Sequence, residues 1–279
     1  MKIIVDAQTH EILGAAILET GGNWRRRGHC QSAVYGHSTG RAHSPDRFGT
    51  HPYNARRTPA AFRRSRRSAV AHREMKRVGE TIPLRRLRRT ELPVDTVELA
   101  RYLVGKVAVH DTDDGRLSGR IVETEAYPVG DSAGHAFRGE TRRNASLFLG
   151  PGHAYVYFAY GSSFMLNVTS EAVGVGAGVL LRALEPLEGI DRMQGLRGGA
   201  GLLDLARGPG RLAQAMQIDF SQDGLDLCAA GPLWLATSRR KTGAIGESVR
   251  IGLTRNVDRK LRFYERGNPY VSGPKRLRE

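Results

Sequence analysis

The chain has 279 residues, 40% of them hydrophobic, which is enough for one good-sized core. Its 43 Lys and Arg against 28 Asp and Glu give a formal net charge of +15, which favours a polyanionic partner. No apolar run approaches the roughly 18 residues of a membrane helix. The two cysteines, Cys30 and Cys228, form no CxxC pair, so we expect no disulfide framework and a reducing, intracellular compartment.

The first 23 residues alternate and then turn apolar, and they resemble a strand–turn–strand from the dimerisation domain of pyridine-nucleotide disulfide oxidoreductases. They are too short to fold alone. They also lack nucleotide-binding glycines and a redox cysteine pair, so no flavin function is expected. Asp6, His10 and Glu11 interrupt the apolar run, which argues against a signal peptide.

The basic charge is concentrated in the N-terminal third. Residues 1–90 hold 19 Lys and Arg against 6 Asp and Glu, whereas residues 91–279 hold 24 against 22. Arginine clusters with Pro, Ser, His and Gly and little periodicity predict disorder over 24–90. This segment is interpreted either as a basic arm that tethers the protein to DNA or, as we favour, as the result of a translation start placed too far upstream, with synthesis beginning near Met75.

From Leu92 the pattern becomes globular. Helices are predicted at 95–104, capped by Asp95 and Thr96 and ended by Gly105, at 186–193, opened by Pro186 and Glu188, and at 209–216, with Pro209 in the first turn. Strands are predicted at 106–110, 117–127, 153–159, 163–169, 178–184, 232–236, 248–253 and 261–264. Many strands without a βαβ rhythm indicate an α+β fold with a mostly antiparallel sheet.

Two segments carry unusual side chains for a core. If 121–127 is a strand, Ile121, Glu123, Glu125 and Tyr127 share one face, which would place two carboxylates and a phenol together. About thirty residues later, the segment 155–161 presents its first two tyrosines on one face and a third in a turn closed by glycine. A carboxylate facing tyrosines suits an enzyme that stacks a flat ring and activates a water beside it.

These segments resemble the alkyladenine (3-methyladenine) DNA glycosylase family of base-excision repair enzymes, from about Leu92 to Ser272. Seven segments carry the resemblance in one order: VETEAY (122–127), His135 with RG (138–139), GPGHAYVYFAYG (150–161), LNV (166–168), LLRALEPLEG (180–189), GPGRLAQA (208–215) and LRFYERGNPYVS (261–272). The resemblance implies a single compact domain at 91–275, with a curved, mostly antiparallel sheet and surrounding helices, after a basic, disordered extension at 1–90.

The implied activity is that of a monofunctional glycosylase that flips damaged purines out of double-stranded DNA and hydrolyses the N-glycosidic bond. It would leave an abasic site, need no cofactor or metal, and act as a monomer in the bacterial cytoplasm, in association with the nucleoid. The motifs contain no lysine or terminal amine that could form a Schiff base, so no lyase activity is expected. The sequence does not rank 3-methyladenine, 7-methylguanine, hypoxanthine and ethenoadenine as substrates.

Glu125 is the candidate general base, because a carboxylate can deprotonate a water and stabilise a cationic sugar. The resemblance places the water-activating glutamate of the family at this position, and a surface carboxylate is the alternative. Glu123 has no catalytic role in the family and is interpreted as a structural partner, for instance of an arginine. Arg182, flanked by leucines, needs an anion. The family uses it beside the catalytic carboxylate and the target phosphate, and a salt bridge with Glu123 or Glu185 is the alternative.

Tyr127, His135 and Tyr157 are the candidate walls of the base pocket, since a flipped and positively charged purine is held by stacking and cation–π attraction. Core packing is the alternative for each aromatic. His135 lies in a loop of small residues and has no second His or Cys at ligand spacing, so no metal site is predicted. Asn167, an amide inside an apolar strand, limits the pocket against the exocyclic amine of guanine in the family.

Tyr160, at the tip of a turn, aligns with the tyrosine that the family inserts into the base stack, and an exposed turn tyrosine is the alternative. Phosphate contacts that position the duplex are expected from Arg138, Thr141, Arg143 and Asn144. The chain departs from the family where Arg142 replaces a proline, and at 162–163, where two serines replace larger groups. Both changes affect the grip on DNA rather than the chemistry.

Three other functions are compatible with parts of the sequence. A noncatalytic module could stack single-stranded bases on the tyrosines and would tolerate Glu125→Gln. A carbohydrate glycosidase could use Glu123 with Glu125, although two carboxylates on one strand are too parallel to flank a bond from opposite sides. A redox protein rests only on residues 1–23.

Overall fold

The computed structural model describes residues 2–5, 12–16, 83–159 and 161–278. The chain divides into two units, residues 1–80 and 81–279. In the first unit, β1 (Lys2–Val5) pairs antiparallel with β2 (Ile12–Ala16). Most of the segment for which disorder is predicted, together with Cys30 and Met75, lies outside the described residues.

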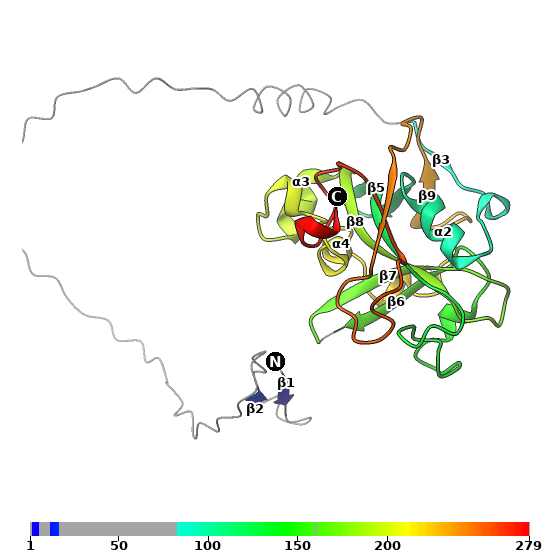
Figure 1. Cartoon of the computed structure of the whole chain (residues 1–279). Coiled ribbons are helices and arrows are strands. Elements are labelled where there is room, and N and C mark those ends of the chain that lie inside the picture. The colour runs from blue at the N-terminus through cyan, green and yellow to red at the C-terminus, as the bar shows by residue number, and fades with distance from the viewer. Residues whose placement is uncertain (1, 6–11, 17–82, 160, 279) are drawn as a thin grey trace, which may run out of the picture. The chain divides into compact units, whose positions relative to one another are not determined.

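The second unit is built on a nine-stranded sheet, and every strand pairing described in it is antiparallel. Seven strands follow the order β3-β9-β4-β5-β8-β7-β6, and Figure 1 labels β5, β8, β7 and β6 of this row. In addition, β10 pairs with β11 and β11 with β5. Their bounds are β3 (Arg85–Arg86), β4 (Val107–Thr112), β5 (Gly115–Tyr127), β6 (Ala154–Ala159), β7 (Ser163–Thr169), β8 (Gly178–Glu188), β9 (Leu233–Thr237), β10 (Ile245–Ser248) and β11 (Arg262–Glu265). The predicted α+β class is confirmed.

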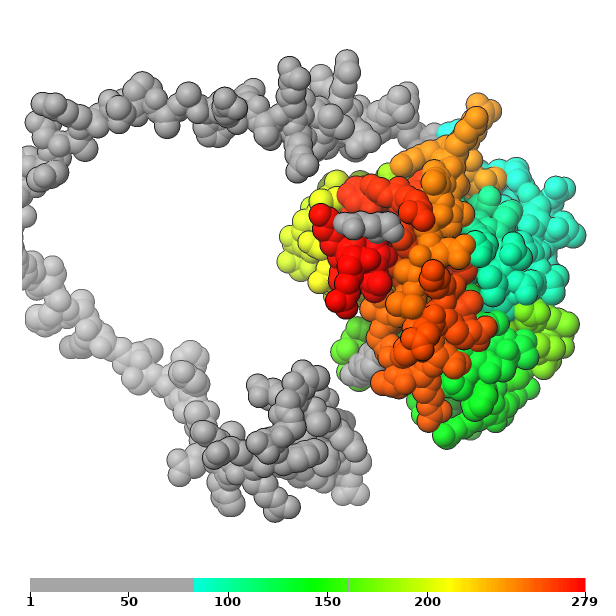
Figure 2. All heavy atoms as spheres, in the orientation of Figure 1, coloured from blue at the N-terminus to red at the C-terminus, as the bar shows by residue number. Residues whose placement is uncertain are grey.

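Three helices pack against this sheet. They are α2 (Thr96–Leu103), α3 (Ile190–Leu196) and α4 (Pro209–Ala215), and short 3-10 turns cover Arg89–Glu91, Ala145–Phe148, Leu202–Asp204, Phe220–Gln222 and Lys275–Leu277. The Asp95 carboxylate caps α2 by accepting from the amides of Val97 and Glu98, as predicted. Leu103 of α2, Leu212 of α4 and Leu181 of β8 meet in the main core. Figure 2 shows the segment after β9, in orange and red, spread over one face of this unit.

Two predicted elements differ from the structure. Pro186 and Glu188 do not open a helix but end β8, and α3 begins at Ile190 after Gly189 adopts a φ of 74°. The predicted strand 248–253 is wrong beyond Ser248, where β10 ends. Residues 249–260 lie outside any regular element and contribute to the site described below.

The strands β5 and β8 are out of simple register where they carry the acidic and basic side chains. Ile121 pairs with Leu184 and Glu123 with Ala183, so that Val122 is skipped. Thr124 then pairs with Leu181, so that Arg182 is skipped as well. Such bulges redirect side chains and occur beside functional sites.

The bulge overturns part of the predicted alternation along β5. Ile121 does not share a face with Glu123: it lies in the main core with Ala126, and Val122 lies in a small cluster with Tyr264. A single extra residue in an antiparallel pair reverses the in-and-out order beyond it. Glu123, Glu125 and Tyr127 still lie on one face of β5, as predicted: Arg182 contacts both carboxylates, and Tyr127 donates to Glu125.

The described fold begins before the predicted boundary at residue 91. Arg85 pairs with Thr237 of β9, and the side chain of Leu87 is buried in the main core. Residues 85–87 thus contribute to the sheet and the main core, while the assignment of the rest of 1–90 to an extension stays a prediction. None of the helices in the described part of the chain is both long and apolar enough to cross a bilayer.

Candidate active site

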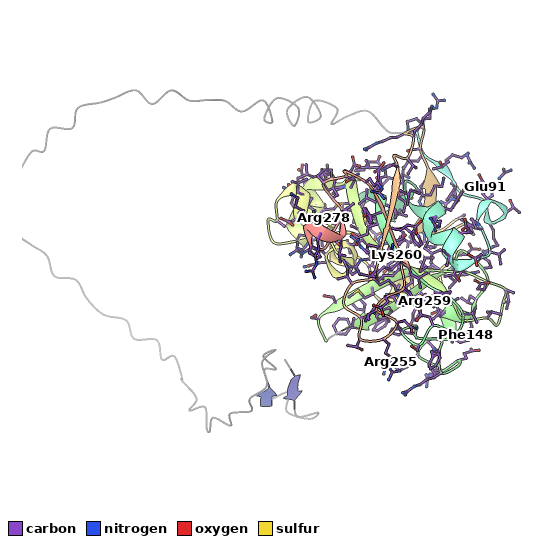
Figure 3. All side chains as sticks on the ribbon, viewed as in Figure 1. Glu91, Phe148, Arg255, Arg259, Lys260 and Arg278 are labelled. Carbon is purple, nitrogen blue, oxygen red and sulfur yellow. The ribbon has the colours of Figure 1, made fainter. Side chains whose placement is uncertain are left out.

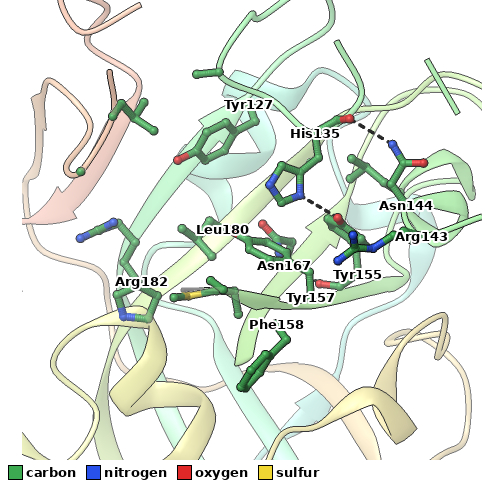
Figure 4. A pocket seen from close by; sticks show the side chains of 18 of the residues that line it. Tyr127, His135, Arg143, Asn144, Tyr155, Tyr157, Phe158, Asn167, Leu180 and Arg182 are labelled. Carbon is green, nitrogen blue, oxygen red and sulfur yellow. Dashed lines mark hydrogen bonds between the residues drawn. The ribbon is translucent and has the colours of Figure 1, made fainter. Parts of the chain in front are cut away.

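A cavity of about 740 Å³ opens beside β6, β7 and β8 (Figure 4). Its size falls within the range of roughly 300–1,000 Å³ that small-molecule sites occupy. It is lined by Tyr127, Ala133, His135, Thr141, Arg143, Asn144, Leu147, Tyr155, Tyr157, Phe158, Ala159, Met165, Asn167, Gly178, Leu180, Arg182, Pro209, Ile251, Gly252 and Leu253. The structure therefore brings together eight of the predicted site residues from five segments of the chain.

Glu125 lies directly behind the wall of this cavity and is fully buried. Its carboxylate accepts hydrogen bonds from the Tyr127 hydroxyl (3.1 Å) and the Ile251 amide (2.7 Å), and it forms an ion pair with Arg182 (3.1 Å). All three of these partners line the cavity. Burial raises the pKa of Glu125 above its ordinary value, and the opposing effects of Arg182 and the Ile251 amide do not cancel it.

Arg182 joins the two carboxylates of β5. Its Nε donates to Glu123 at 2.8 Å and its Nη1 lies 3.1 Å from Glu125. The salt bridge considered as the alternative for Arg182 therefore exists with Glu123, whereas Glu185 pairs with Arg240. A single guanidinium shared by two buried acids fixes the position of both.

Glu123 is held as a structural carboxylate, as interpreted from the sequence. It also accepts from Arg262 Nε (2.7 Å) and from both the amide and the hydroxyl of Ser272 (2.6 and 2.9 Å). Burial alone would raise the pKa of Glu123, but Arg182, Arg262 and these hydrogen bonds outweigh it and hold the pKa below its ordinary value. The two neighbouring carboxylates thus have pKa values shifted in opposite directions, which is a common sign of divided roles.

Three aromatic rings form one wall of the cavity. The His135 ring centroid lies 4.3 Å from that of Tyr157, and the His135 Nδ1 is 2.7 Å from the Tyr155 hydroxyl. Desolvation and the charge of Arg143 lower the pKa of His135, which favours a neutral ring. Tyr155 was missed by the sequence reasoning as a site residue, although it shares the face of Tyr157 in the alternation of β6. Figure 4 shows these rings and Tyr127 around the cavity.

Asn167 lies on β7 and borders the cavity while remaining buried. Its Nδ2 donates to the main-chain oxygen of Tyr155 at 3.1 Å. The amide inside an apolar strand is thus hydrogen-bonded, as the sequence required. Its predicted effect on guanine stays a prediction.

The loop that carries the predicted phosphate contacts is organised by Asn144. Its side chain accepts from the amide and hydroxyl of Thr141 and donates to the main-chain oxygens of His135 and Gly139. These four bonds use the full capacity of a side-chain amide. Asn144 therefore shapes the loop. Thr141 and Arg143 are exposed and line the cavity, whereas Arg138 is exposed but does not line the cavity. Their phosphate contacts stay predictions, as does the wedge role of Tyr160, which lies outside the described residues.

The loop after β10 supplies site residues that were not predicted. The Ile251 amide reaches Glu125, and the buried Arg250 side chain forms an ion pair with Asp131. No chemical signal in the sequence marks this segment, because a main-chain donor leaves no trace in the residue type. Among the described residues, no group of three His, Cys, Asp or Glu side chains is arranged to hold a metal ion.

Residues 90–269 match the model of a family described as methylpurine-DNA glycosylase. This match covers more than half of the chain. The chain belongs to the methylpurine-DNA glycosylase family. Family membership supports a role as a DNA glycosylase in DNA repair.

Curated relatives agree with this assignment. A protein of Mesorhizobium japonicum named "Putative 3-methyladenine DNA glycosylase" is 64% identical over 191 residues, which cover 68% of this chain and 92% of the relative. Proteins with the same name from Paraburkholderia phytofirmans and Chlorobaculum parvum are 54% and 46% identical, over 70% and 66% of this chain and 92% and 91% of their own lengths.

Proposed function

We propose that this protein is a monofunctional DNA glycosylase that flips damaged purines out of duplex DNA and hydrolyses their N-glycosidic bond. The observation that carries the proposal is Glu125, a buried carboxylate with a raised pKa directly behind a cavity walled by aromatic rings. The substrates are purines of the 3-methyladenine, 7-methylguanine, hypoxanthine and ethenoadenine class.

Glu125 acts as the general base. As the bond between C1′ and the base breaks, its electron pair leaves with the base and positive charge develops on the sugar. The oxygen of a water bonds to C1′, and its proton passes to the Glu125 carboxylate. Arg182 keeps the carboxylate in place, and the raised pKa of Glu125 makes it a better proton acceptor than an ordinary glutamate.

The flipped base stacks between Tyr127 and the pair formed by His135 and Tyr157. The centroids of these two rings already lie 4.3 Å apart, so the rings form a fixed wall before the base arrives. Tyr155 holds His135 through its hydroxyl, which sets the orientation of the imidazole. Pre-arranged aromatic walls reduce the entropy that is lost on binding.

Two exposed basic loops that contribute to the lining of the cavity contact the DNA backbone. Thr141 and Arg143 line the cavity from one loop, and residues 251–253 line it from the other. The second loop continues to Arg255 and Arg259, whose side chains are exposed and drawn in Figure 3. Because residues 91–279 are nearly neutral overall, such local clusters are the means of attracting phosphates.

The reaction leaves an intact strand with an abasic site. A lyase step would need an amine that attacks C1′ to form a Schiff base. No lysine lines the cavity in the part of the chain that the structure describes. The product is therefore a strand that breaks only after alkali.

The test compares wild type with Glu125→Gln on a duplex carrying one hypoxanthine and, separately, on methylated DNA. We expect strand breaks only after alkali and only with wild type. Glutamine keeps the size of the side chain but cannot accept the proton, so we expect a loss of roughly 10²–10⁴-fold in single-turnover rate.

Binding to the same duplexes by both proteins is the control. Release of bases from methylated DNA but not from the hypoxanthine duplex would support the glycosylase activity and limit its substrates to charged bases. If neither protein releases a base while both bind DNA, the proposal is wrong and the noncatalytic base-stacking module takes its place.

A further inference from the structure

The guanidinium of Arg250 packs against Tyr127, one of the aromatic rings that line the cavity. The Arg250 guanidinium carbon is 4.5 Å from the centre of the Tyr127 ring, at cation–π distance. The Arg250 side chain has no exposed surface and does not line the cavity, whereas Tyr127 does. The guanidinium therefore lies on the side of the ring that is turned away from the cavity.

The ring is a principal partner of this guanidinium. Arg250 Nη1 donates to the main-chain oxygen of Ala126 at 3.0 Å and forms an ion pair with Asp131. Its Nε and Nη2 atoms are buried and find no hydrogen-bond partner among the described residues. The Ala133 amide and Asn256 Nδ2 donate to Asp131 Oδ1, whereas Oδ2 faces Arg250 and lies 3.9 Å from Arg259, so the carboxylate serves several donors.

A base stacked on the open face of Tyr127 would share that ring with Arg250. The guanidinium already draws on the electrons of the ring, which leaves less for a second cation on the opposite face. Its charge also repels a positively charged base and leaves a neutral base almost unaffected. The arrangement penalises cationic lesions in particular.

We propose that Arg250 is a specificity-determining residue that, acting through Tyr127, disfavours positively charged purine lesions relative to neutral ones. This inference rests on the proposed function, because it assumes that a lesion base stacks on Tyr127. Asp131 sets the strength of the effect by neutralising part of the Arg250 charge.

The size of the effect follows from the geometry. Adding a stacking distance of about 3.5 Å to the 4.5 Å measured behind the ring places the base roughly 8 Å from the guanidinium. One unit charge at about 8 Å and an effective dielectric constant of about 20 changes an affinity ratio by roughly 30-fold. Because Asp131 offsets part of this charge, we expect a change of about threefold to tenfold when both charges are removed together.

The experiment measures single-turnover release of 7-methylguanine, a cation, and of hypoxanthine, a neutral base, from otherwise identical duplexes. The readout is the ratio of the two specificity constants. Arg250→Met should raise this ratio in favour of 7-methylguanine, and Arg250→Met with Asp131→Asn should raise it less. Asp131→Asn alone should lower it, because it leaves the Arg250 charge unopposed. Arg250→Lys, which keeps the charge, is the matched control and should stay closest to wild type.

The outcomes separate this inference from the proposed function. A merely structural role for Arg250 would slow the release of both bases alike and leave the ratio unchanged, which would overturn the inference. Thermal unfolding identifies variants that do not fold. Arg250→Met or Asp131→Asn, whichever folds, is enough to test the inference, since the two are expected to shift the ratio in opposite directions. If both unfold, the pair is structural and the inference fails. Release of neither base by wild type would instead refute the proposed function.

Discussion

Glu123 and Glu125 lie two residues apart on the same strand, yet their replacement by glutamine should have opposite consequences. The Glu123 carboxylate accepts from two arginines and twice from Ser272, at 2.6–2.9 Å. In Glu123→Gln, one carboxylate oxygen becomes an NH₂ group that must face another donor. Both arginines are almost completely buried, so they would lose their common anion without gaining water, and only Arg182 would keep a second carboxylate, that of Glu125.

The cost can be worked out from this geometry. Breaking a buried ion pair by removing one partner costs about 3–5 kcal/mol. A domain of 150–250 residues loses about 2–4 °C in Tm for each kcal/mol. We therefore expect the Tm of Glu123→Gln to fall by roughly 6–20 °C at pH 7. Since the pKa of Glu123 is lowered by folding, this stabilisation is present above its unfolded pKa and is lost as the pH falls through the folded value.

Glu125→Gln is the matched control. The pKa of Glu125 is raised by folding, so the contribution of this group to stability is lost as the pH rises through its folded value. Removing its charge at pH 7 should therefore leave the Tm unchanged or raise it, while activity is lost. The assay is thermal unfolding of both variants by circular dichroism at pH 5 and pH 7. A Tm for Glu123→Gln within about 2 °C of wild type at pH 7 would refute the reasoning.

Two further predictions concern activity. Glu125 must be ionised to accept a proton, and its pKa is raised. The single-turnover rate should therefore be high above that pKa and fall below it, at a pH above the usual range of a glutamate. A pH profile measured on hypoxanthine duplex checks this, and a flat profile down to pH 4 would contradict it. Tyr155→Phe removes the 2.7 Å contact with His135, worth about 0.5–1.5 kcal/mol. K1/2, the enzyme concentration that gives half of the maximal single-turnover rate, should therefore rise by roughly twofold to tenfold at an unchanged Tm. An unaltered K1/2 would show that His135 does not need this contact.

Much of the fold could be predicted because strands and helix ends leave local signals. The Asp95 cap and the apolar spacing after it define α2, and Pro209 marks the first turn of α4. A helix was predicted at Pro186 because proline is common at helix starts. In the structure Pro186 lies in β8 and pairs with Gly119, next to an irregularity in register. That position tolerates a residue without an amide hydrogen, and only the neighbouring strand reveals it.

The candidate site could be predicted less completely, and the reason is physical. The alternation along two strands pointed to Glu125 and Tyr127 on β5 and to Tyr157 on β6, because side chains that break the pattern of a core are visible in the sequence. The bulge that skips Val122 and Arg182 was not visible, since it depends on how two strands far apart in the chain are aligned. Contacts between loops, such as that of Arg250 with Asp131, are likewise set by tertiary packing.

The hydrogen bond from Ile251 to Glu125 has an evolutionary consequence. Its donor is a main-chain amide, which every amino acid except proline provides. The side chain of the same residue borders the cavity. Substitutions at 251 can thus reshape the space available to a ligand while the anchor of the carboxylate is inherited unchanged. One position can diversify the substrates of a lineage without putting its chemistry at risk.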